Sequence, residues 1–242
     1  MVQLAVRHDG AVTELPRAAL TRPSALERLR RDVVELRATR LRSVARILDL
    51  RSLGDPVVVV TEPVPGVPLS AYLARGPLPP GPALQVLGDV ARALQMMAWH
   101  GVLHGGVTAD RVVVGPDGRA RITGFGVARA LCDTDPDQWS DAYDFAVLAH
   151  LTLTGRPPPL SPDDGLEALP WRAADVLLAG LSEPAHARPL PHQVMQSLRR
   201  IPAEEWTRRS PVPVPAIAPP PPPDPAPDPA TFDWEPEPDG PR

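Results

Sequence analysis

The sequence predicts an α+β protein with two lobes, followed by a tail that remains unfolded. Three observations favour this class. Residues 2–15 alternate apolar and polar side chains around an Asp-Gly turn signal, and residues 112–122 place a Gly-Pro-Asp-Gly turn between an apolar run and a second short strand, as β-hairpins do. Residues 83–100 repeat apolar side chains at helical spacing. From residue 210 onward proline dominates, and such a composition buries too little apolar surface to form a core.

The first part of the chain predicts strands around one helix. Ser24 precedes Glu27 by three residues, which is the spacing of a helix-capping box. The apolar residues that follow at helical spacing are Leu26, Leu29, Val33 and Leu36. Two apolar runs, 44–50 and 56–62, predict a pair of strands. Residues 1–62 are therefore expected to form the smaller lobe.

A mainly helical lobe is expected next. Residues 63–68 contain three prolines and predict the connection between the lobes. A short helix from residue 69 and the long helix at 83–100 precede the second hairpin. Further helices are expected from Ser140, over 170–181 and over 191–201. These elements place the larger lobe at 69–204 and leave 205–242 as a disordered, Pro-rich and acidic tail.

Charge and composition exclude several classes of protein. A net charge of −4 argues against a nucleic-acid-binding protein, which usually carries a basic surplus. No apolar run is long enough to predict a membrane span. The single cysteine, Cys132, cannot form an intramolecular disulfide. A cytoplasmic location is therefore expected, because single cysteines are typical of proteins in reducing compartments.

The basic residues show a strong bias. All 25 are arginine, and the chain contains neither lysine nor asparagine. Ten of these arginines lie between Arg7 and Arg46. Such a band is usually a solvated face, but it also offers the best candidate surface for an acidic partner.

Two loop motifs flank the second hairpin. The first is His104-Gly105-Gly106-Val107-Thr108-Ala109-Asp110-Arg111, and the second is Gly124-Phe125-Gly126. This layout resembles the catalytic core of the eukaryotic-type (Hanks-type) Ser/Thr protein kinase family. In that family the stretch reads HRDLKPEN, then two strands, then DFG. The resemblance implies a bilobal protein-kinase-like fold of bacterial type, with an N-lobe truncated before its first strand.

The resemblance also implies that the groups acting on ATP are replaced. The catalytic-base Asp of the family falls on Gly106, the second metal-binding Asn on Arg111 and the first metal-binding Asp on Gly124. The phosphate-anchoring Lys falls on Glu14, or on Ala5 in an alternative alignment. Because these residues bind neither magnesium nor phosphate in the family manner, no metal and no other cofactor are expected.

Other family positions are retained or partly retained. The resemblance gives structural roles to His104, Phe125, Gly126, Asp141 and Arg188. In relatives the aspartate ties the catalytic loop together, and the arginine pairs with a glutamate of an APE motif that this chain lacks. The helix glutamate of the family falls near Asp32, with Glu35 as the alternate. Backbone groups near Glu62 and Val64 stand where adenine is contacted.

The structural positions of the family are retained while the groups that act on ATP are replaced, and this combination predicts a degenerate pseudokinase. The expected function is a catalytically inactive, protein-binding or regulatory module, and the chain is therefore not expected to be an enzyme. One alternative is an atypical Ser/Thr protein kinase or nucleotide sensor. Another is an adaptor whose Pro-rich tail carries the binding. The expected partner is a protein, such as an active kinase or a regulatory protein, with neither nucleic acid nor a membrane span involved.

Overall fold

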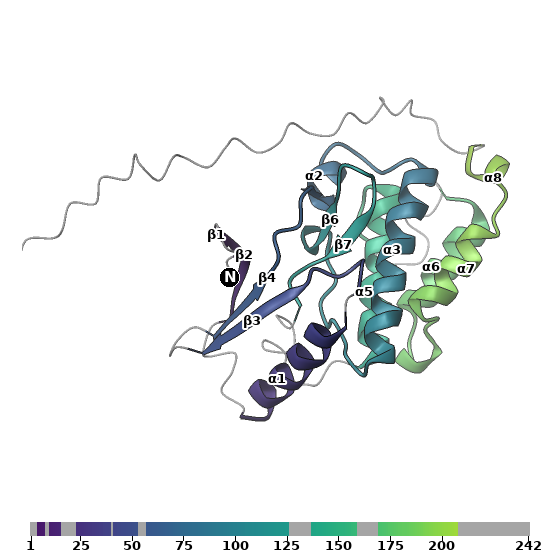
Figure 1. Cartoon of the computed structure of the whole chain (residues 1–242). Helices are drawn as coiled ribbons and strands as arrows, with labels where there is room; N and C mark the ends of the chain where they lie inside the picture. Colours follow the sequence, from purple (N-terminus) through teal and green to yellow (C-terminus); the bar gives the residue numbers. More distant parts are fainter. Residues whose placement is uncertain are drawn as a thin grey trace, which may run out of the picture.

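The computed structural model describes residues 4–7, 10–15, 23–39, 41–52, 57–125, 137–158 and 169–207. Figure 1 shows a strand-rich lobe with one helix beside it, and a lobe of long helices packed against its other side. The expected α+β class with a small strand-containing lobe and a helical lobe is confirmed. Gly126, Cys132 and nearly all of the tail lie outside the described residues.

The smaller lobe is built on an antiparallel sheet of four strands. These are β1 (Leu4–Arg7), β2 (Gly10–Leu15), β3 (Ile47–Ser52) and β4 (Val57–Thr61), in the order β1-β2-β4-β3. Strand β4 lies inside the sheet, and four of its five residues are buried, which explains its unbroken run of valines. The hairpin expected at 2–15 therefore forms the edge of this sheet and pairs with β4.

One helix, α1 (Pro23–Ala38), accompanies the sheet and packs against β3. Its buried side chains Leu29, Val33 and Leu36 recur every three or four residues, so that one stripe faces the core. Asp32 is also buried, whereas Glu35 is exposed and lies 3.0 Å from His100 of the larger lobe. The helical period in the sequence thus correctly predicted the inward face.

The two lobes are joined through the backbone of residues 43–45. The Ile122 N–H donates to the Ser43 carbonyl, and the Ala45 N–H donates to the Ile122 carbonyl, both at 2.9 Å. This contact explains why β3 begins at Ile47 and not at residue 44, as the apolar run predicted. Ile122 ends β7 (Ala120–Ile122), which forms a second sheet with β5 (Val67–Pro68) and β6 (Val112–Val114).

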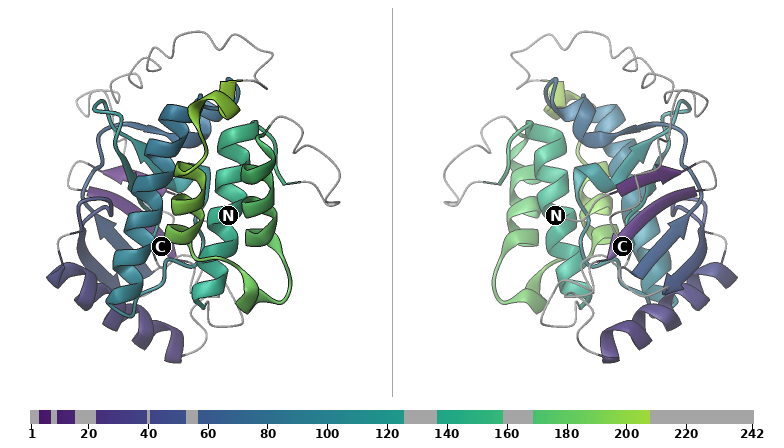
Figure 2. Two further views of the ribbon diagram at one scale, coloured as in Figure 1. Left: turned by 90° about the vertical axis from the view of Figure 1, so that its right-hand side faces the viewer. Right: turned by 90° about the vertical axis from the view of Figure 1, so that its left-hand side faces the viewer.

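The larger lobe is helical, as expected. Its helices are α2 (Leu69–Leu73), α3 (Pro80–Trp99), α5 (Gln138–Thr154), α6 (Trp171–Leu181), α7 (Pro191–Arg199) and the unexpected α8 (Ala203–Thr207). Helix α8 extends past residue 204, where the lobe boundary was predicted. Helices α3, α5, α6 and α7 pack against one another as a bundle, which is visible in Figure 2. Within the described ranges, no helix is both long enough and apolar enough to cross a membrane.

Two buried contacts fix this lobe. A Cβ atom at Gly180 of α6 would lie 2.6 Å from the Cβ of Ala146, so glycine permits the close approach of α5 and α6. Asp89 of α3 is 3% exposed; it accepts the Ala120 N–H at 3.0 Å and pairs with Arg119 at 2.8 Å. The long helix thereby holds β7, whose end leads into the second loop motif.

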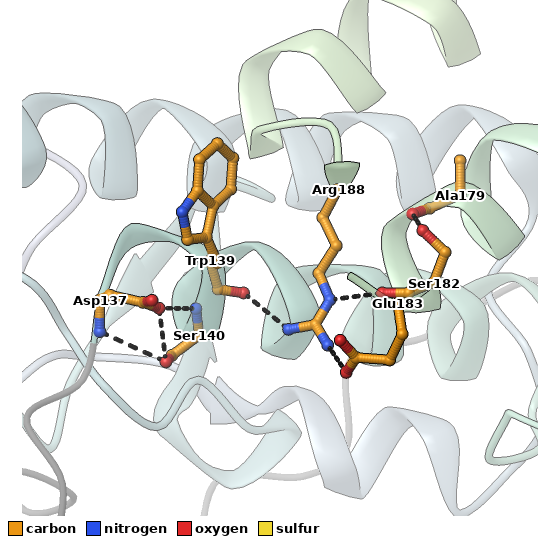
Figure 3. Close-up of polar contacts among 7 residues, drawn as sticks. All are labelled: Asp137, Trp139, Ser140, Ala179, Ser182, Glu183 and Arg188. Carbon is orange, nitrogen blue, oxygen red and sulfur yellow. Dashed lines mark hydrogen bonds and ion pairs between the residues drawn. The ribbon is translucent and has the colours of Figure 1, made fainter. Parts of the chain in front are cut away.

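Arg188 ties the turn before α7 to the start of α5 (Figure 3). It donates to the carbonyls of Ser182 at 2.9 Å and Trp139 at 3.3 Å, and it pairs with the Glu183 carboxylate. Its guanidinium also lies 4.9 Å from the ring centroid of Tyr143. The sequence left open whether Arg188 finds another acid or remains a solvated turn residue. It finds Glu183, five residues earlier in the same turn.

Replacing Arg188 should destabilise the larger lobe. The side chain is 10% exposed, so Arg188→Met would leave the Ser182 and Trp139 carbonyls without this donor. Unpaired buried polar groups cost about 1–3 kcal/mol each, and we expect a loss of about 3 kcal/mol in the free energy of unfolding in urea. The matched change Glu183→Gln affects a 76% exposed partner and should cost less than about 1 kcal/mol. Equal losses for the two variants would contradict this account.

Candidate functional site

The loop His104–Gly106 is held from below by α5. Asp141 accepts the His104 N–H at 3.0 Å and the Gly105 N–H at 2.7 Å, one on each carboxylate oxygen. The carboxylate is 4% exposed and stands in the first turn of α5, where the helix dipole favours negative charge. The Asp137–Ser140 capping box fixes the start of this helix. The loop backbone is thus anchored by α5, the helix that Arg188 also contacts.

His104 connects the loop to the strand that precedes the second motif. Its Nε2 lies 3.0 Å from the Thr123 carbonyl, which can only accept, so this nitrogen carries the proton. The ring is buried, and burial lowers the pKa of His104 to about 4. The imidazole is therefore neutral at pH 7. In the structure it packs between loop and strand.

Arg111 occupies the centre of the site. Its NH1 group donates to the Gly106 carbonyl at 2.6 Å, and its own carbonyl accepts the Thr123 N–H at 2.7 Å. Burial lowers the pKa of the guanidinium, while the nearby Asp144 and Asp110 carboxylates raise it. An arginine keeps its proton under such opposing effects, so a fixed positive charge stands in the site.

Gly124 lies directly beside the Arg111 side chain. Its φ of +70° is in the left-handed region, which glycine adopts without strain. A Cβ atom at this position would lie 3.0 Å from the Cδ of Arg111 and 3.1 Å from its Cγ. The structure therefore brings Gly106, Arg111 and Gly124 together, as the two sequence motifs implied.

The residues at this place do not fit a magnesium ion. Magnesium requires carboxylate or other oxygen ligands, whereas the side-chain charge contributed here by residues 106, 111 and 124 is the guanidinium alone. In the part of the chain that the structure describes, no cluster of three or more histidine, cysteine or acidic side chains is arranged to hold a metal.

A further acidic residue joins the site. The Asp144 carboxylate accepts the Val107 N–H at 3.0 Å, one residue after Gly106. Burial raises the pKa of Asp144 to about 6, the Val107 N–H lowers it, Asp141 raises it and Arg111 lowers it. Sequence reasoning missed this residue. The available signal was its spacing, because a residue three positions after Asp141 in a helix faces the same way.

The connection between the lobes is the Pro-rich segment 63–68. The Glu62 N–H donates to the Arg46 carbonyl at 2.8 Å, and the Glu62 side chain accepts the Arg46 N–H at 3.2 Å. Among the described residues, nothing accepts a hydrogen bond from the half-buried Val64 N–H. Pro63 and Pro65 have no N–H, so Val64 offers the only such donor of these three residues.

The remaining candidate residues are spread over both lobes. Glu14 lies on β2 and pairs with Val58 of β4, whereas Ala5 lies on the edge strand β1. Phe125 is 2% exposed and belongs to the core. Arg188 lies in the turn before α7, and Gly126 lies outside the described residues.

Similar proteins were found among bacterial kinases. The chain is 32% identical to the serine/threonine-protein kinase pkn2 of Myxococcus xanthus, over 59% of this chain and 16% of that protein. It is 28% identical to the serine/threonine-protein kinase PknB of Mycolicibacterium smegmatis, over 62% of this chain and 29% of that protein. The chain thus spans less than a third of the length of these relatives.

Solved structures support the same fold. The kinase domain of Mycobacterium tuberculosis PknI matches with a TM-score of 0.67 at 21% sequence identity. The match covers 82% of this chain and 88% of that domain. The protein-kinase-like fold with a small N-lobe and a helical C-lobe, which the sequence motifs implied, is therefore confirmed.

The comparisons correct one expectation. The missing carboxylates and lysine predicted that the chain is not an enzyme. The relatives are named serine/threonine-protein kinases, and the similar structure is a kinase domain. These findings point to a kinase, so the expectation of a non-enzyme was wrong. It followed from the replacement of family residues at the positions that act on ATP.

The family model covers both the sheet and the site. The model of the protein tyrosine and serine/threonine kinase family matches residues 13–148, from β2 to α5. This range is more than half of the chain and includes the two loop motifs and Asp141. Together with the bacterial relatives, it shows that the chain belongs to the protein tyrosine and serine/threonine kinase family, among the bacterial Hanks-type kinases.

Proposed function

We propose that this chain is an atypical Ser/Thr protein kinase or nucleotide sensor that binds a nucleotide through Arg111 and not through a metal ion. The observation that carries the proposal is the position of the Arg111 guanidinium, between the Gly106 carbonyl and Gly124. Arginine has five N–H donors, and the bond to Gly106 uses one. The others match phosphate oxygens in geometry and charge.

The connection between the lobes supports the same function. The Val64 N–H lies at the connection between the lobes without an acceptor among the described residues. A backbone N–H of this kind can donate to a ring nitrogen of adenine. Half-buried donors usually find a partner, so a ligand that accepts here gains a hydrogen bond without losing one elsewhere.

Asp144 adds a titratable carboxylate to the site. Its pKa of about 6 lies closer to neutral pH than that of an ordinary aspartate, and burial is the main cause. Perturbed carboxylates of this kind are typical of functional sites, and a pKa near the working pH suits a group that accepts a proton. In the proposed function, Asp144 sets the charge around Arg111 and the loop.

The proposal extends to the output of the domain. We place the chain in the cytoplasm, where ATP is available, and we propose that its nucleotide-bound state is recognised by a protein partner, either an active kinase or a regulatory protein. Trp99 and Trp171 are 71% and 64% exposed, and large aromatic side chains are enriched at protein interfaces.

Binding of ATP should not depend on magnesium, and it should depend on Arg111. By calorimetry, we expect similar affinities in excess magnesium and in EDTA. Arg111→Ala should weaken binding about tenfold or more, as expected for the loss of charge-assisted hydrogen bonds. The matched control Arg121→Ala changes another arginine, from the nearby strand β7, and should bind as the unmodified chain does.

A double variant tests whether Arg111 replaces the metal. Arg111→Asn together with Gly124→Asp restores the residue types that hold magnesium in the family. We expect its ATP binding to become magnesium-dependent. Transfer of labelled phosphate to protein substrates is measured in the same samples: transfer identifies an atypical kinase, and binding without transfer identifies a nucleotide sensor. An unmodified chain that binds no ATP under either condition would overturn the proposal.

Removing the charge of Asp144 should stabilise the protein, increasingly so as the pH rises. The native pKa of about 6 exceeds the ordinary value of about 3.9, so the native state holds this proton more tightly than the unfolded state does. This contribution to stability is present below pH 4 and is lost as the pH rises through 6. Asp144→Asn retains an acceptor for Val107 without the charge, and its free energy of unfolding should exceed that of the unmodified chain by about 2 kcal/mol at pH 7.5.

The measurement is urea unfolding of both proteins from pH 4 to 8. His104 shifts in the opposite direction but is common to both, so a pH-independent difference would refute the assignment.

A further inference from the structure

A hollow of about 220 Å³ lies between the end of α1, the segment before β3 and the end of β4. Its apolar lining includes Leu36, Leu41 and Val44. Its polar lining includes Arg42, Arg46 and Glu62. This place is separate from Arg111 and the loop motifs. It shares Glu62 with the connection between the lobes, where the proposed function uses the Val64 N–H.

The size of the hollow restricts what it can hold. Sites for small molecules and cofactors usually enclose about 300–1,000 Å³. A hollow of about 220 Å³ is smaller and suits one or two side chains of a peptide. Leu36 and Val44 are 4% and 7% exposed, so its apolar walls are firmly packed and an apolar or aromatic side chain is the natural occupant.

Charge restricts the occupant further. The side chains of Arg42 and Arg46 are exposed, and within the described part of the chain neither guanidinium has an acidic partner. Glu62 is the acidic residue of the lining, and it is engaged with the backbone N–H of Arg46. The hollow therefore combines apolar walls with two available cations, which favours an aromatic side chain flanked by carboxylates.

We propose that this hollow is the docking site for residues 232–239 of the same chain. That segment reads Phe-Asp-Trp-Glu-Pro-Glu-Pro-Asp. Each of its two aromatic residues is followed directly by an acidic residue, and two further acids come after them. Over residues 224–239 the sequence has six acids and no basic residue. One of the aromatic side chains, Phe232 or Trp234, occupies the hollow, and neighbouring carboxylates pair with Arg42 and Arg46.

The connecting chain is long enough for this contact. Residues 208–231 provide 24 residues between the end of α8 and Phe232. At about 3.1 Å per residue in an extended proline-rich chain, they span up to about 75 Å. A folded domain of about 200 residues has a radius of gyration of about 16 Å, so the segment can reach any face. Tethering also supplies an effective concentration of the order of millimolar, which makes a weak contact sufficient.

Docking here is coupled to the candidate site through the backbone. Val44 and Ala45 line the hollow, and Ala45 is hydrogen-bonded to Ile122, two residues before Gly124. A docked segment therefore rests on the residues that hold β7 and the second loop motif. A partner that displaces the segment would contact the same residues, Val44 and Ala45, that join the two lobes.

The test uses the full-length chain without nucleotide, so its result is independent of the proposed function. In a Cys132→Ser background, Pro236→Cys carries a nitroxide label, and broadening of backbone amide NMR signals is measured. We expect broadening at residues 41–46 and 62, with strong relief in about 1 M salt, where the Debye length is about 3 Å. Broadening at another surface, or at none, overturns the proposal.

Matched variants separate charge from aromatic packing. Arg42→Glu with Arg46→Glu should abolish the broadening, whereas Arg75→Glu with Arg200→Glu, two exposed arginines elsewhere, should not. Phe232→Ser with Trp234→Ser should abolish the broadening without changing the folded residues that line the hollow, so the test remains decisive if the arginine variant fails to fold.

Mixing nitroxide-labelled chains with isotope-enriched chains that carry no nitroxide shows whether the broadening arises within one chain or between two. Broadening that appears in the mixture with the same strength shows a second copy as the occupant and overturns docking within one chain.

Discussion

The site depends on one buried carboxylate. Asp141 accepts hydrogen bonds from two successive backbone N–H groups, those of His104 and Gly105, and thereby fixes the loop that ends at Gly106. Without this acceptor, two buried donors would be unpaired, which costs more than the hydrogen bonds themselves contribute. The Gly106 carbonyl then receives Arg111, so the direction of the guanidinium follows from the position of α5.

Elements fixed by local sequence patterns could be predicted from the sequence, whereas those fixed by contacts between distant residues could not. The hairpins, α1 and α3 follow local patterns of apolar residues, and those patterns were sufficient to locate them. The helix starts were misplaced: α1 begins at Pro23, before the expected cap Ser24, and α3 begins at Pro80 and not at residue 83. The start of β3 was misplaced because Ala45 pairs with Ile122, far away in sequence. The path of Arg111 could not be predicted either, since it uses space left by Gly124, thirteen residues later. Asp144 was missed because its role depends on the Val107 N–H and on burial, neither of which a motif contains.

The exclusive use of arginine has physical consequences at several places. A guanidinium resists deprotonation even when half-buried, whereas an ammonium in the position of Arg111 would lose its proton more readily. Its planar shape also allows Arg188 to lie 4.9 Å from the Tyr143 ring centroid while donating to two carbonyls and pairing with a carboxylate. A lysine has three donors, but they lie on one nitrogen without a planar face, so it could not spread them over these partners as the three guanidinium nitrogens do.

The contact between Arg111 and Gly124 also has an evolutionary consequence. A Cβ atom added at residue 124 would lie 3.0 Å from the Cδ of Arg111, so an aspartate there requires the arginine side chain to shift. Each position therefore sets which substitutions the other tolerates, which is epistasis in its simplest steric form. The order of substitution therefore matters: a shorter side chain at residue 111 removes the close contact, whereas a side chain added first at residue 124 requires Arg111 to move.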